Sequence, residues 1–291
     1  MVIQELGSHF DLNKITKSGQ AFRFYPAGKE KYVLAAGNRA VMMEILPDGQ
    51  SGFYTSQEEF DAIWTPYFDL DMDYSRIEER ILQAEDPYLL SAFHAGKGIR
   101  ILRQDPWECL VSFILSQRKN TPAIKKAVDA LCRAGGKKIF LTAEDKLMED
   151  HRQDGFFLKE LYAFPGPEEL AGFTDADWAG LRLGYREKYL RRLAEEAASG
   201  KVDLKSLTHL SDQELKDRLL SLYGVGEKVA SCVMLYGFHR LSAFPRDVWI
   251  NRVLDDHYQG KLDLEKFSPY QGVVQQFLFE YARNQEKTKQ A

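Results

Sequence analysis

Cysteine is scarce in this chain, and the spacing of its few cysteines excludes several kinds of site. The 291 residues include three, Cys109, Cys132 and Cys232. They are too widely spaced for a zinc knuckle or an iron–sulfur loop, and an odd number does not suit a secreted disulfide framework. We therefore expect neither a cysteine-bound metal nor a fold stapled by disulfides.

Long apolar runs are also missing. No stretch reaches the roughly eighteen apolar residues of a membrane-spanning helix. The start of the chain, MVIQELGSHFDLNK, lacks the charged and then apolar order of a signal peptide. We expect a protein that works in the cytoplasm and has no membrane partner.

Positive charge is not in excess, since 39 Lys and Arg stand against 43 Asp and Glu, giving a net charge of -4 and a pI of about 5.9. Whole-chain charge governs solubility and nonspecific association, but a local surface can still be basic. Two segments meet this condition, and each read alone is more typical of a solvated helix face. They contain Arg118, Lys119, Lys125 and Lys126 in one case and Arg182, Arg186, Lys188, Arg191 and Arg192 in the other.

The hydrophobic pattern changes near residue 55. Before it, apolar residues alternate between turn sequences, as in Val41, Met43 and Ile45, which predicts an antiparallel sheet. After it the periodicity is helical almost to the end. We therefore predict an α+β fold, a small N-terminal twisted antiparallel sheet domain joined to a larger all-helical body of two subdomains. The expected divisions are 1–95 for the sheet with trailing helices, 96–210 for one helical subdomain and 211–291 for the other, with 141–155 as a surface excursion.

The most informative segment is 222–247, LYGVGEKVASCVMLYGFHRLSAFPRD. Ser211 and Glu214 form a capping box that opens a helix before it, and apolar residues at helical spacing predict a second helix after its glycines. Gly224 and Gly226 allow a tight turn between the two. The free N–H groups at the start of the second helix can bind a phosphate, although such a turn is often only packing.

Lys228 falls in the first turn of the second helix, and Asp247 follows it after the helix ends. The positive end of the helix dipole disfavours the ammonium form, and a neutral amine can attack carbon. Pro245 disfavours helix at the residue before it, so Asp247 stands where an N-cap would precede VWINRVL. A solvated lysine and a plain N-cap are the alternatives when each residue is read alone.

These residues resemble the helix-hairpin-helix, Gly/Pro-Asp glycosylase superfamily, and more closely a bacterial-type member of the 8-oxoguanine DNA glycosylase family. Further similar segments, in the same order, are SGQAFRF (18–24), IRILRQDPWECLVSFILSQ (99–117), LRLGYREKY (181–189) and GVVQQFLFEYAR (272–283). The resemblance covers nearly the whole chain. It implies a base-excision-repair enzyme that removes 8-oxoguanine from duplex DNA and has β-eliminating AP lyase activity, with a cleft between the helical subdomains and, lacking C-terminal cysteines, no iron–sulfur cluster.

Cleavage of an N-glycosidic bond needs a nucleophile on one side of C1′ and negative charge near the developing oxocarbenium ion. The resemblance gives the first role to Lys228, which would form a Schiff base, and the second to Asp247. The imine acidifies the C2′ proton and so permits elimination of the 3′ phosphate.

The resemblance also implies a pocket for a base flipped out of the duplex. Cys232, one helical turn after Lys228, would pack on one face of the base and Phe279 on the other, while Gln275 reads its Watson–Crick edge. The Gly19 carbonyl would accept a hydrogen bond from N7–H of 8-oxoguanine and repel the unprotonated N7 of guanine. Without the resemblance, these residues would be ordinary core or turn residues.

The residues expected to face the opposite strand depart from the family pattern. Arg118 stands where an asparagine fills the vacated stack, and Ala123 replaces an arginine that reads the estranged cytosine, while the wedge Tyr185 and the second reader Arg186 are retained. We expect weaker discrimination for cytosine than in members with both arginines. Trp249 replaces a histidine near a DNA phosphate and can still donate one hydrogen bond. Further expected DNA contacts are Asn120, Gly224, Gly226 and Val229. With the phosphate-binding hairpin beside them, the two basic segments are better interpreted as part of a DNA footprint than as solvated helix faces.

No cofactor is expected to be required, although the backbone carbonyls of Leu220, Leu222 and Val225 form a candidate site for a structural monovalent cation at the hairpin. We expect a monomer that binds double-stranded DNA containing 8-oxoguanine at the bacterial nucleoid. Two other functions stay open. A monofunctional glycosylase for alkylated bases would use water and need no Lys228, and in a noncatalytic helix-hairpin-helix protein Lys228 would touch only phosphate.

Overall fold

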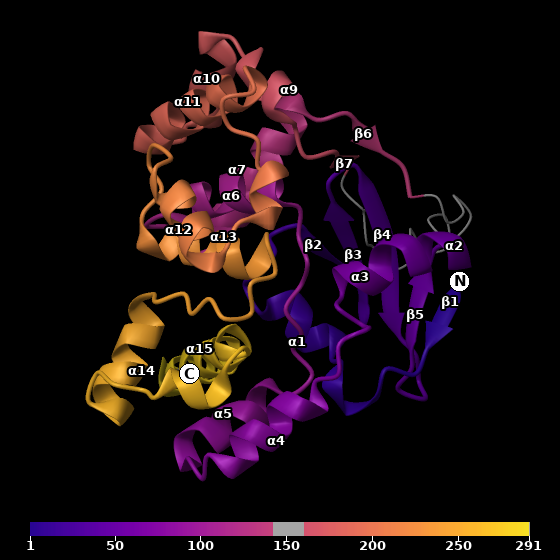
Figure 1. Cartoon of the computed structure of the whole chain (residues 1–291). Helices are drawn as coiled ribbons and strands as arrows, with labels where there is room; N and C mark the ends of the chain where they lie inside the picture. Colours follow the sequence, from indigo (N-terminus) through magenta and orange to yellow (C-terminus); the bar gives the residue numbers. More distant parts are fainter. Residues whose placement is uncertain (142–159, 291) are drawn as a thin grey trace.

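The computed structural model describes residues 1–141 and 160–290, so nearly all of the predicted excursion at 141–155 lies outside the described residues. The fold is α+β, as predicted. An antiparallel sheet stands on one side and the helices on the other, with the N terminus at the sheet and the C terminus in α15 (Figure 1).

The sheet has five strands in the order β1-β5-β4-β3-β2, and every neighbouring pair is antiparallel. Its strands are β1 Val2–Gln4, β2 Phe24–Gly28, β3 Lys31–Ala36, β4 Arg39–Ile45 and β5 Ser51–Tyr54, and a separate pair joins β6 Lys138–Ile139 to β7 Leu161–Tyr162. The predicted alternation is present, but both faces are buried. Leu34 and Val41 pack in one hydrophobic cluster, whereas Val33 and Met42 pack in another that includes Leu161.

The helices fall into an N-terminal set and a larger body. The N-terminal set is η1 Gly7–His9, α1 Leu12–Lys17, α2 Gln57–Glu59, the π-helical turn η2 Phe60–Trp64, α3 Thr65–Tyr67, α4 Ser75–Gln83 and α5 Pro87–Gly96. The body begins with α6 Pro106–Ser116, α7 Thr121–Gly135, α9 Pro167–Ala171, α10 Asp175–Leu181, η4 Gly184–Arg186 and α11 Glu187–Ala198. It continues with η5 Ser206–His209, α12 Asp212–Leu220, α13 Glu227–Tyr236, α14 Val248–Tyr258, η6 Leu264–Phe267 and α15 Gln271–Gln290.

Local side-chain caps set the ends of the helices around the hairpin. Ser211 accepts from the backbone N–H of Glu214, whose carboxylate accepts from Ser211 N–H, so the predicted capping box opens α12. Gly226 is the N-cap of α13 and Asp247 that of α14. The helix-hairpin-helix unit therefore has the predicted order.

Helices α4 and α5 share one hydrophobic core with the helical body. Ile77 and Phe93 belong to the same buried cluster as Phe277 of α15. The helices approach closely at Gly96, where an added Cβ would lie 2.7 Å from Phe277 Cδ1. The predicted boundary at residue 95 thus coincides with the end of α5, although α5 itself packs with the body.

Two buried arginines join the N-terminal segments to the helices. Arg23 pairs with Glu108 of α6 at 3.2 Å and also donates to the Tyr162 carbonyl. Arg100 donates to several backbone carbonyls that precede α4, including that of Met72 at 2.6 Å, and lies 4.0 Å over the Tyr74 ring. Among the described residues no helix is long and apolar enough to cross a membrane.

Candidate active site

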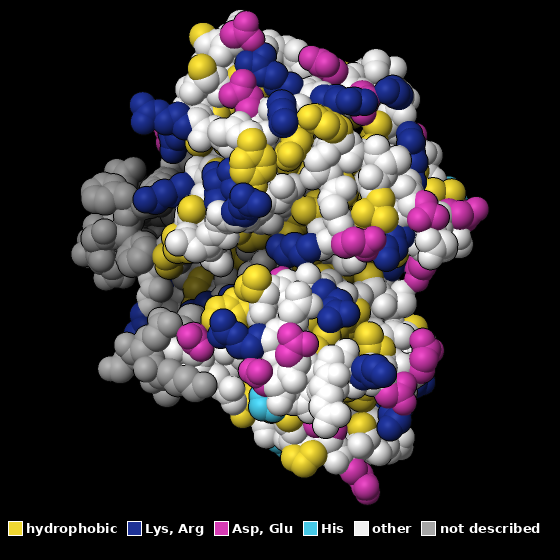
Figure 2. All heavy atoms as spheres, turned by 90° about the vertical axis from the view of Figure 1, so that its left-hand side faces the viewer, with side chains coloured by type: hydrophobic (Ala, Val, Ile, Leu, Met, Phe, Trp, Pro, Cys, Tyr) yellow, Lys and Arg dark blue, Asp and Glu magenta, His cyan; other side chains and the backbone are white. Residues whose placement is uncertain are grey.

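A cavity of about 1130 Å³ opens where distant parts of the chain meet. Its walls are formed by residues 16–22, the end of α6 with the start of α7, the start of α13, residues 246–251, and α15. In the space-filling view a hollow contains hydrophobic side chains and has Lys and Arg side chains on both sides (Figure 2). The cavity has room for a flipped nucleotide and a basic surrounding for a polyanion.

The two predicted catalytic residues line this one cavity from two helices. Lys228 is in the first turn of α13, and its Nζ lies 5.5 Å from the centre of the Phe113 ring. Within the described chain no carboxylate forms an ion pair with it. Asp247 caps α14 through Oδ1, which accepts from the N–H groups of Trp249 at 3.0 Å and Ile250 at 2.9 Å. Its Oδ2 accepts no hydrogen bond from any described residue, so one carboxylate oxygen stays available.

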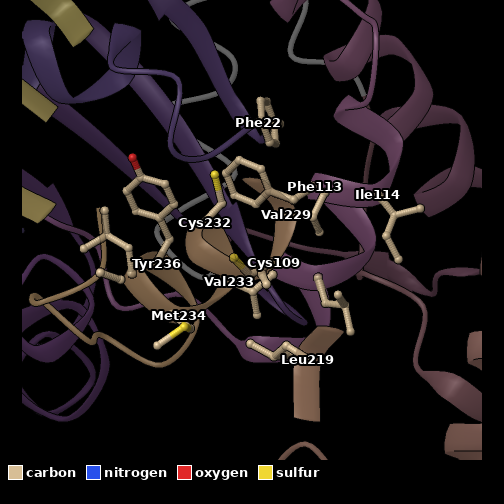
Figure 3. Packing of buried hydrophobic residues seen from close by; sticks show 14 of the residues in the cluster. Phe22, Cys109, Phe113, Ile114, Leu219, Val229, Cys232, Val233, Met234 and Tyr236 are labelled. Carbon is tan, nitrogen blue, oxygen red and sulfur yellow. The ribbon is translucent and has the colours of Figure 1, made fainter. Parts of the chain in front are cut away.

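Cys232 lies one turn beyond Lys228, behind the cavity surface. Its side chain is 3% exposed and is grouped with Phe22 and Phe113 (Figure 3). Burial raises the pKa of the Cys232 thiol to about 12, and the charge of Asp247 adds to this while that of Lys228 opposes it. The thiol is therefore neutral at physiological pH and offers an apolar, polarizable contact surface.

The predicted base pocket is only partly open. Gly19 and Phe279 line the cavity, whereas Cys232 and Gln275 are buried and do not. The Gln275 Oε1 atom is enclosed without a hydrogen-bond donor among the described residues. A buried acceptor of this kind costs free energy unless a ligand supplies its donor.

The two hairpin glycines are needed for different reasons. Gly224 has φ +88° and packs against Tyr189, whose Cγ would lie 2.3 Å from an added Cβ. Gly226 has φ -106° and nothing within 4 Å of the position of a Cβ. The absence of a side chain therefore leaves the exposed backbone accessible there. Val229 has a buried side chain, which restricts any DNA contact there to its N–H group in the first turn of α13.

The segment between α6 and α7 carries the predicted contacts to the opposite strand. Arg118 is exposed, has φ +53° and lines the cavity. Asn120 also lines it, but its side chain caps α7 by accepting from Ala123 N–H at 3.0 Å. Ala123 is absent from the lining, so an arginine in its place would reach the cavity only through its long side chain.

Tyr185 and Arg186 lie beside this segment. Tyr185 is 40% exposed, as a wedge must be. Arg186 is buried and donates to the carbonyls of Gln117 and Leu183, so its guanidinium is occupied by backbone in this conformation. Its predicted reading of a cytosine requires these bonds to be shared or exchanged. Trp249 lines the cavity, where its indole N–H has no protein acceptor among the described residues.

Arg246 and Arg283 line the cavity but were not named as candidates from the sequence, and Lys125 was named there only as part of a basic segment. Arg246 lines the cavity and holds Asn251 through a 3.1 Å hydrogen bond. Lys125 also lines it, and burial lowers the pKa of Lys125. Arg283 completes the wall beside Phe279, with its guanidinium 5.2 Å from the ring centre. The sequence carried a signal for Arg246, which stands directly before Asp247. Lys125 and Arg283 reach the cavity only through tertiary packing.

The candidate cation carbonyls are partly used by the hairpin. The Leu222 carbonyl accepts from Val225 N–H at 3.1 Å, and a carbonyl oxygen keeps a second lone pair for a cation. The Leu222 carbonyl could therefore still contribute to a cation site at this turn, and the site itself stays a prediction. No group of three His, Cys, Asp or Glu side chains in the described part of the chain could hold a metal ion.

The fold is that of a DNA glycosylase with a helix-hairpin-helix unit. Residues 2–110 match the family model for the 8-oxoguanine DNA glycosylase N-terminal domain. The chain is 32% identical to the Clostridium acetobutylicum 8-oxoguanine glycosylase/lyase, solved with double-stranded DNA containing cytosine opposite to 8-oxoG. That match covers 98% of this chain and 95% of the other, with a TM-score of 0.84.

Two further relatives agree. The chain is 35% identical to MBOgg1, solved in complex with a low affinity DNA ligand, over 98% of this chain and 99% of that one, with a TM-score of 0.84. The N-glycosylase/DNA lyase of Saccharomyces cerevisiae is 28% identical over 276 residues, which is 87% of this chain and 69% of the yeast protein. The chain belongs to the 8-oxoguanine DNA glycosylase family.

Proposed function

We infer that the protein is a bifunctional DNA glycosylase and AP lyase that removes 8-oxoguanine from duplex DNA in base-excision repair. One observation carries the catalytic assignment. Lys228, with no ion-pair partner in the described chain, and Asp247, with one free carboxylate oxygen, line the same cavity from successive helices. A lysine so placed can act as a nucleophile as well as a phosphate contact.

In the proposed reaction, Lys228 Nζ attacks C1′ while the bond from C1′ to the base nitrogen breaks. The base leaves with that electron pair and takes up a proton. Asp247 stabilises the positive charge that develops on the sugar through its free oxygen. Opening of the sugar ring and loss of the amine protons give an imine, and removal of a C2′ proton then expels the 3′ phosphate.

The flipped base occupies the cavity between Phe279 and Cys232, which replace part of the stacking lost from the duplex. Flipping costs a few kcal/mol, and stacking on an aromatic side chain offsets it. Entry of the base uncovers Cys232 and Gln275, since neither lines the open cavity. Gln275 Oε1 then gains the donor that it lacks, from an N–H of the Watson–Crick edge.

The remaining assignments extend the same proposal. The protein acts as a monomer on the nucleoid of the bacterial cytoplasm. Gly226 and the first turn of α13 bind a phosphate of the lesion strand, and Trp249 donates to another through its indole N–H. A monovalent cation at the carbonyls of Leu220, Leu222 and Val225 stabilises the hairpin without entering the reaction.

Borohydride trapping on a duplex with one 8-oxoguanine tests the function. The wild-type chain should form a covalent adduct that disappears in Lys228→Gln and persists in Lys201→Gln, an exposed lysine paired with Glu196 outside the cavity. Base release without an adduct would favour the monofunctional glycosylase for alkylated bases. Tight binding with neither adduct nor release would favour a noncatalytic DNA-binding protein.

A further inference from the structure

Residues 17–20, here called the recognition loop, bring Lys17 and Gly19 to the cavity wall and are held from α15. The Lys17 carbonyl accepts from Arg283 Nη2 at 2.5 Å. The Ser18 carbonyl accepts from Gln276 Nε2 at 3.2 Å. Gln276 is 1% exposed, so its amide must find its partners inside the protein. Two side chains of one helix thus fix the first half of the loop.

One carbonyl of this loop differs from its neighbours. The Gln20 carbonyl accepts from Gln104 Nε2 at 2.7 Å, so those of Lys17, Ser18 and Gln20 all have protein donors. The Gly19 carbonyl has none within the described residues, and Gly19 lines the cavity with φ +81°. The loop is therefore built to keep one acceptor free at the wall while its flanking acceptors are satisfied.

Tyr236 connects this loop to the helix that carries Lys228. Its hydroxyl donates to Gln276 Oε1 at 2.7 Å, which orients the amide so that Nε2 faces Ser18. Its backbone carbonyl accepts from the N–H of Gln104, the residue whose side chain holds Gln20. Tyr236, the last residue of α13, is therefore linked through hydrogen bonds to both neighbours of Gly19, to Ser18 through Gln276 and to Gln20 through Gln104.

The placement of Tyr236 along α13 adds to this connection. Lys228, Cys232 and Tyr236 are spaced by four residues, so they follow one face of the helix. The Tyr236 ring stacks on Phe113 at 5.6 Å and 13°, and Phe113 also lies under Lys228 Nζ. The hydroxyl can therefore be removed while the ring keeps its packing.

We propose that Tyr236 and Gln276 are positioning residues that hold the free Gly19 carbonyl at the lesion base and tie it to the helix of the nucleophile. The proposal rests on the glycosylase function inferred above and assigns it a specificity device. A carbonyl discriminates an N–H donor from a bare acceptor only if it cannot turn away, because rotation relieves the repulsion of the wrong base. Neither residue touches the substrate.

Comparing two activities of the same cavity provides the test. Excision of 8-oxoguanine needs the base to be read, whereas cleavage of a preformed abasic site needs Lys228 but has no base. In single turnover, Tyr236→Phe and Gln276→Met should each slow excision about tenfold, the upper range for loss of one neutral hydrogen bond. Both variants should cleave the abasic strand within about twofold of wild type. The double variant should be no slower than Gln276→Met, because the two residues act in series.

Tyr25→Phe is the matched control. It removes a partly buried hydroxyl that donates to Asp129 at 2.6 Å, and because neither residue lines the cavity it should leave both activities unchanged. Each variant is assayed below its own unfolding temperature, and Gln276→Met carries the test if Tyr236→Phe fails to fold. Equal loss of the two activities, or no loss of either, would overturn the proposal. A wild-type chain that fails to excise 8-oxoguanine would instead overturn the underlying function.

Discussion

The two sides of the cavity differ in how firmly their residues are held before DNA binds. On the α15 side, the recognition loop has its flanking carbonyls tied to Gln276 and Gln104, so its geometry exists before DNA arrives. On the other side, Arg118 is exposed between α6 and α7, and its guanidinium makes no hydrogen bond or ion pair with described residues. Ordering such a side chain on binding costs conformational entropy, whereas the loop has already been ordered by folding. With the proposed site assignments, the lesion would meet a rigid wall and the opposite strand an adaptable one.

The largest effect is expected from Asp247→Asn, at a helix N-cap that is also fixed before DNA binds. Asparagine is an equally good N-cap, so α14 keeps its bonds to Trp249 and Ile250 and the protein keeps its stability. Loss of the carboxylate charge should slow base excision by about 10²- to 10³-fold, the range for removing one electrostatic group from an active site. Single-turnover excision and thermal unfolding measure the two quantities. Asp105→Asn, at the N-cap of α6, is the control and should leave excision intact.

The hairpin glycines separate folding from DNA contact. Gly224→Ala combines a positive φ with a clash against Tyr189 and should cost about 1–3 kcal/mol of stability. Gly226→Ala meets open space, so it should fold like the wild type and bind DNA about tenfold more weakly, because the methyl group stands where a phosphate approaches the backbone. Chemical denaturation and DNA titration check the pair. Full DNA affinity in Gly226→Ala would place the phosphate elsewhere.

The adaptable side should discriminate poorly between opposite bases. With Ala123 in place of an arginine, excision opposite cytosine and opposite adenine should differ by less than about tenfold, since one good side-chain pair is worth about 1–3 kcal/mol of discrimination. Introducing Ala123→Arg should increase the preference for cytosine. Single-turnover rates on the two duplexes decide this, and a hundredfold preference for cytosine in the wild type would contradict it.

The smallest effect concerns backbone charge beside the hairpin. Lys188 Nζ lies 5.9 Å and the Arg192 guanidinium 5.0 Å from the ring of Tyr223, which is exposed next to Gly224. Lys188→Ala should reduce the slope of log affinity against log salt by about 1. Arg192→Ala should reduce it less, because Glu196 already neutralises that charge at 3.1 Å. Lys266→Ala, far along the chain in η6, should leave the slope unchanged.

Sequence reasoning succeeded where the cause of a structure is local. The capping box at Ser211, the N-cap at Asp247 and the tight turn at Gly224 depend on residues a few positions apart, and all three occur as predicted. The sheet was recognisable from alternation, but the burial of its second face was not, because Leu161 of a distant segment helps to cover Val33.

The rest of the candidate site depends on contacts between distant residues. Gln276 and Ser18 are 258 positions apart, and no periodicity links them. The hydrogen bond from Arg186 to the Gln117 carbonyl and the burial of Gln275 likewise depend on tertiary packing. The residue types alone could therefore suggest which groups surround a base. Whether each group is exposed, buried or hydrogen-bonded before DNA binds could be determined only from the three-dimensional structure.

The contacts of the buried Arg23 and Arg100 affect how the protein can bind a DNA duplex. Arg23 joins the N-terminal segment to α6 through Glu108, and Arg100 joins the segment before α6 to carbonyls that precede α4. We therefore expect the protein to have little freedom to wrap around a straight duplex. The DNA must then bend instead, and the free energy of bending depends on how easily the base-pair steps next to the lesion unstack. Lesions beside flexible pyrimidine–purine steps should be excised faster than those in stiff A-tracts, which a panel of duplexes with one fixed lesion can measure.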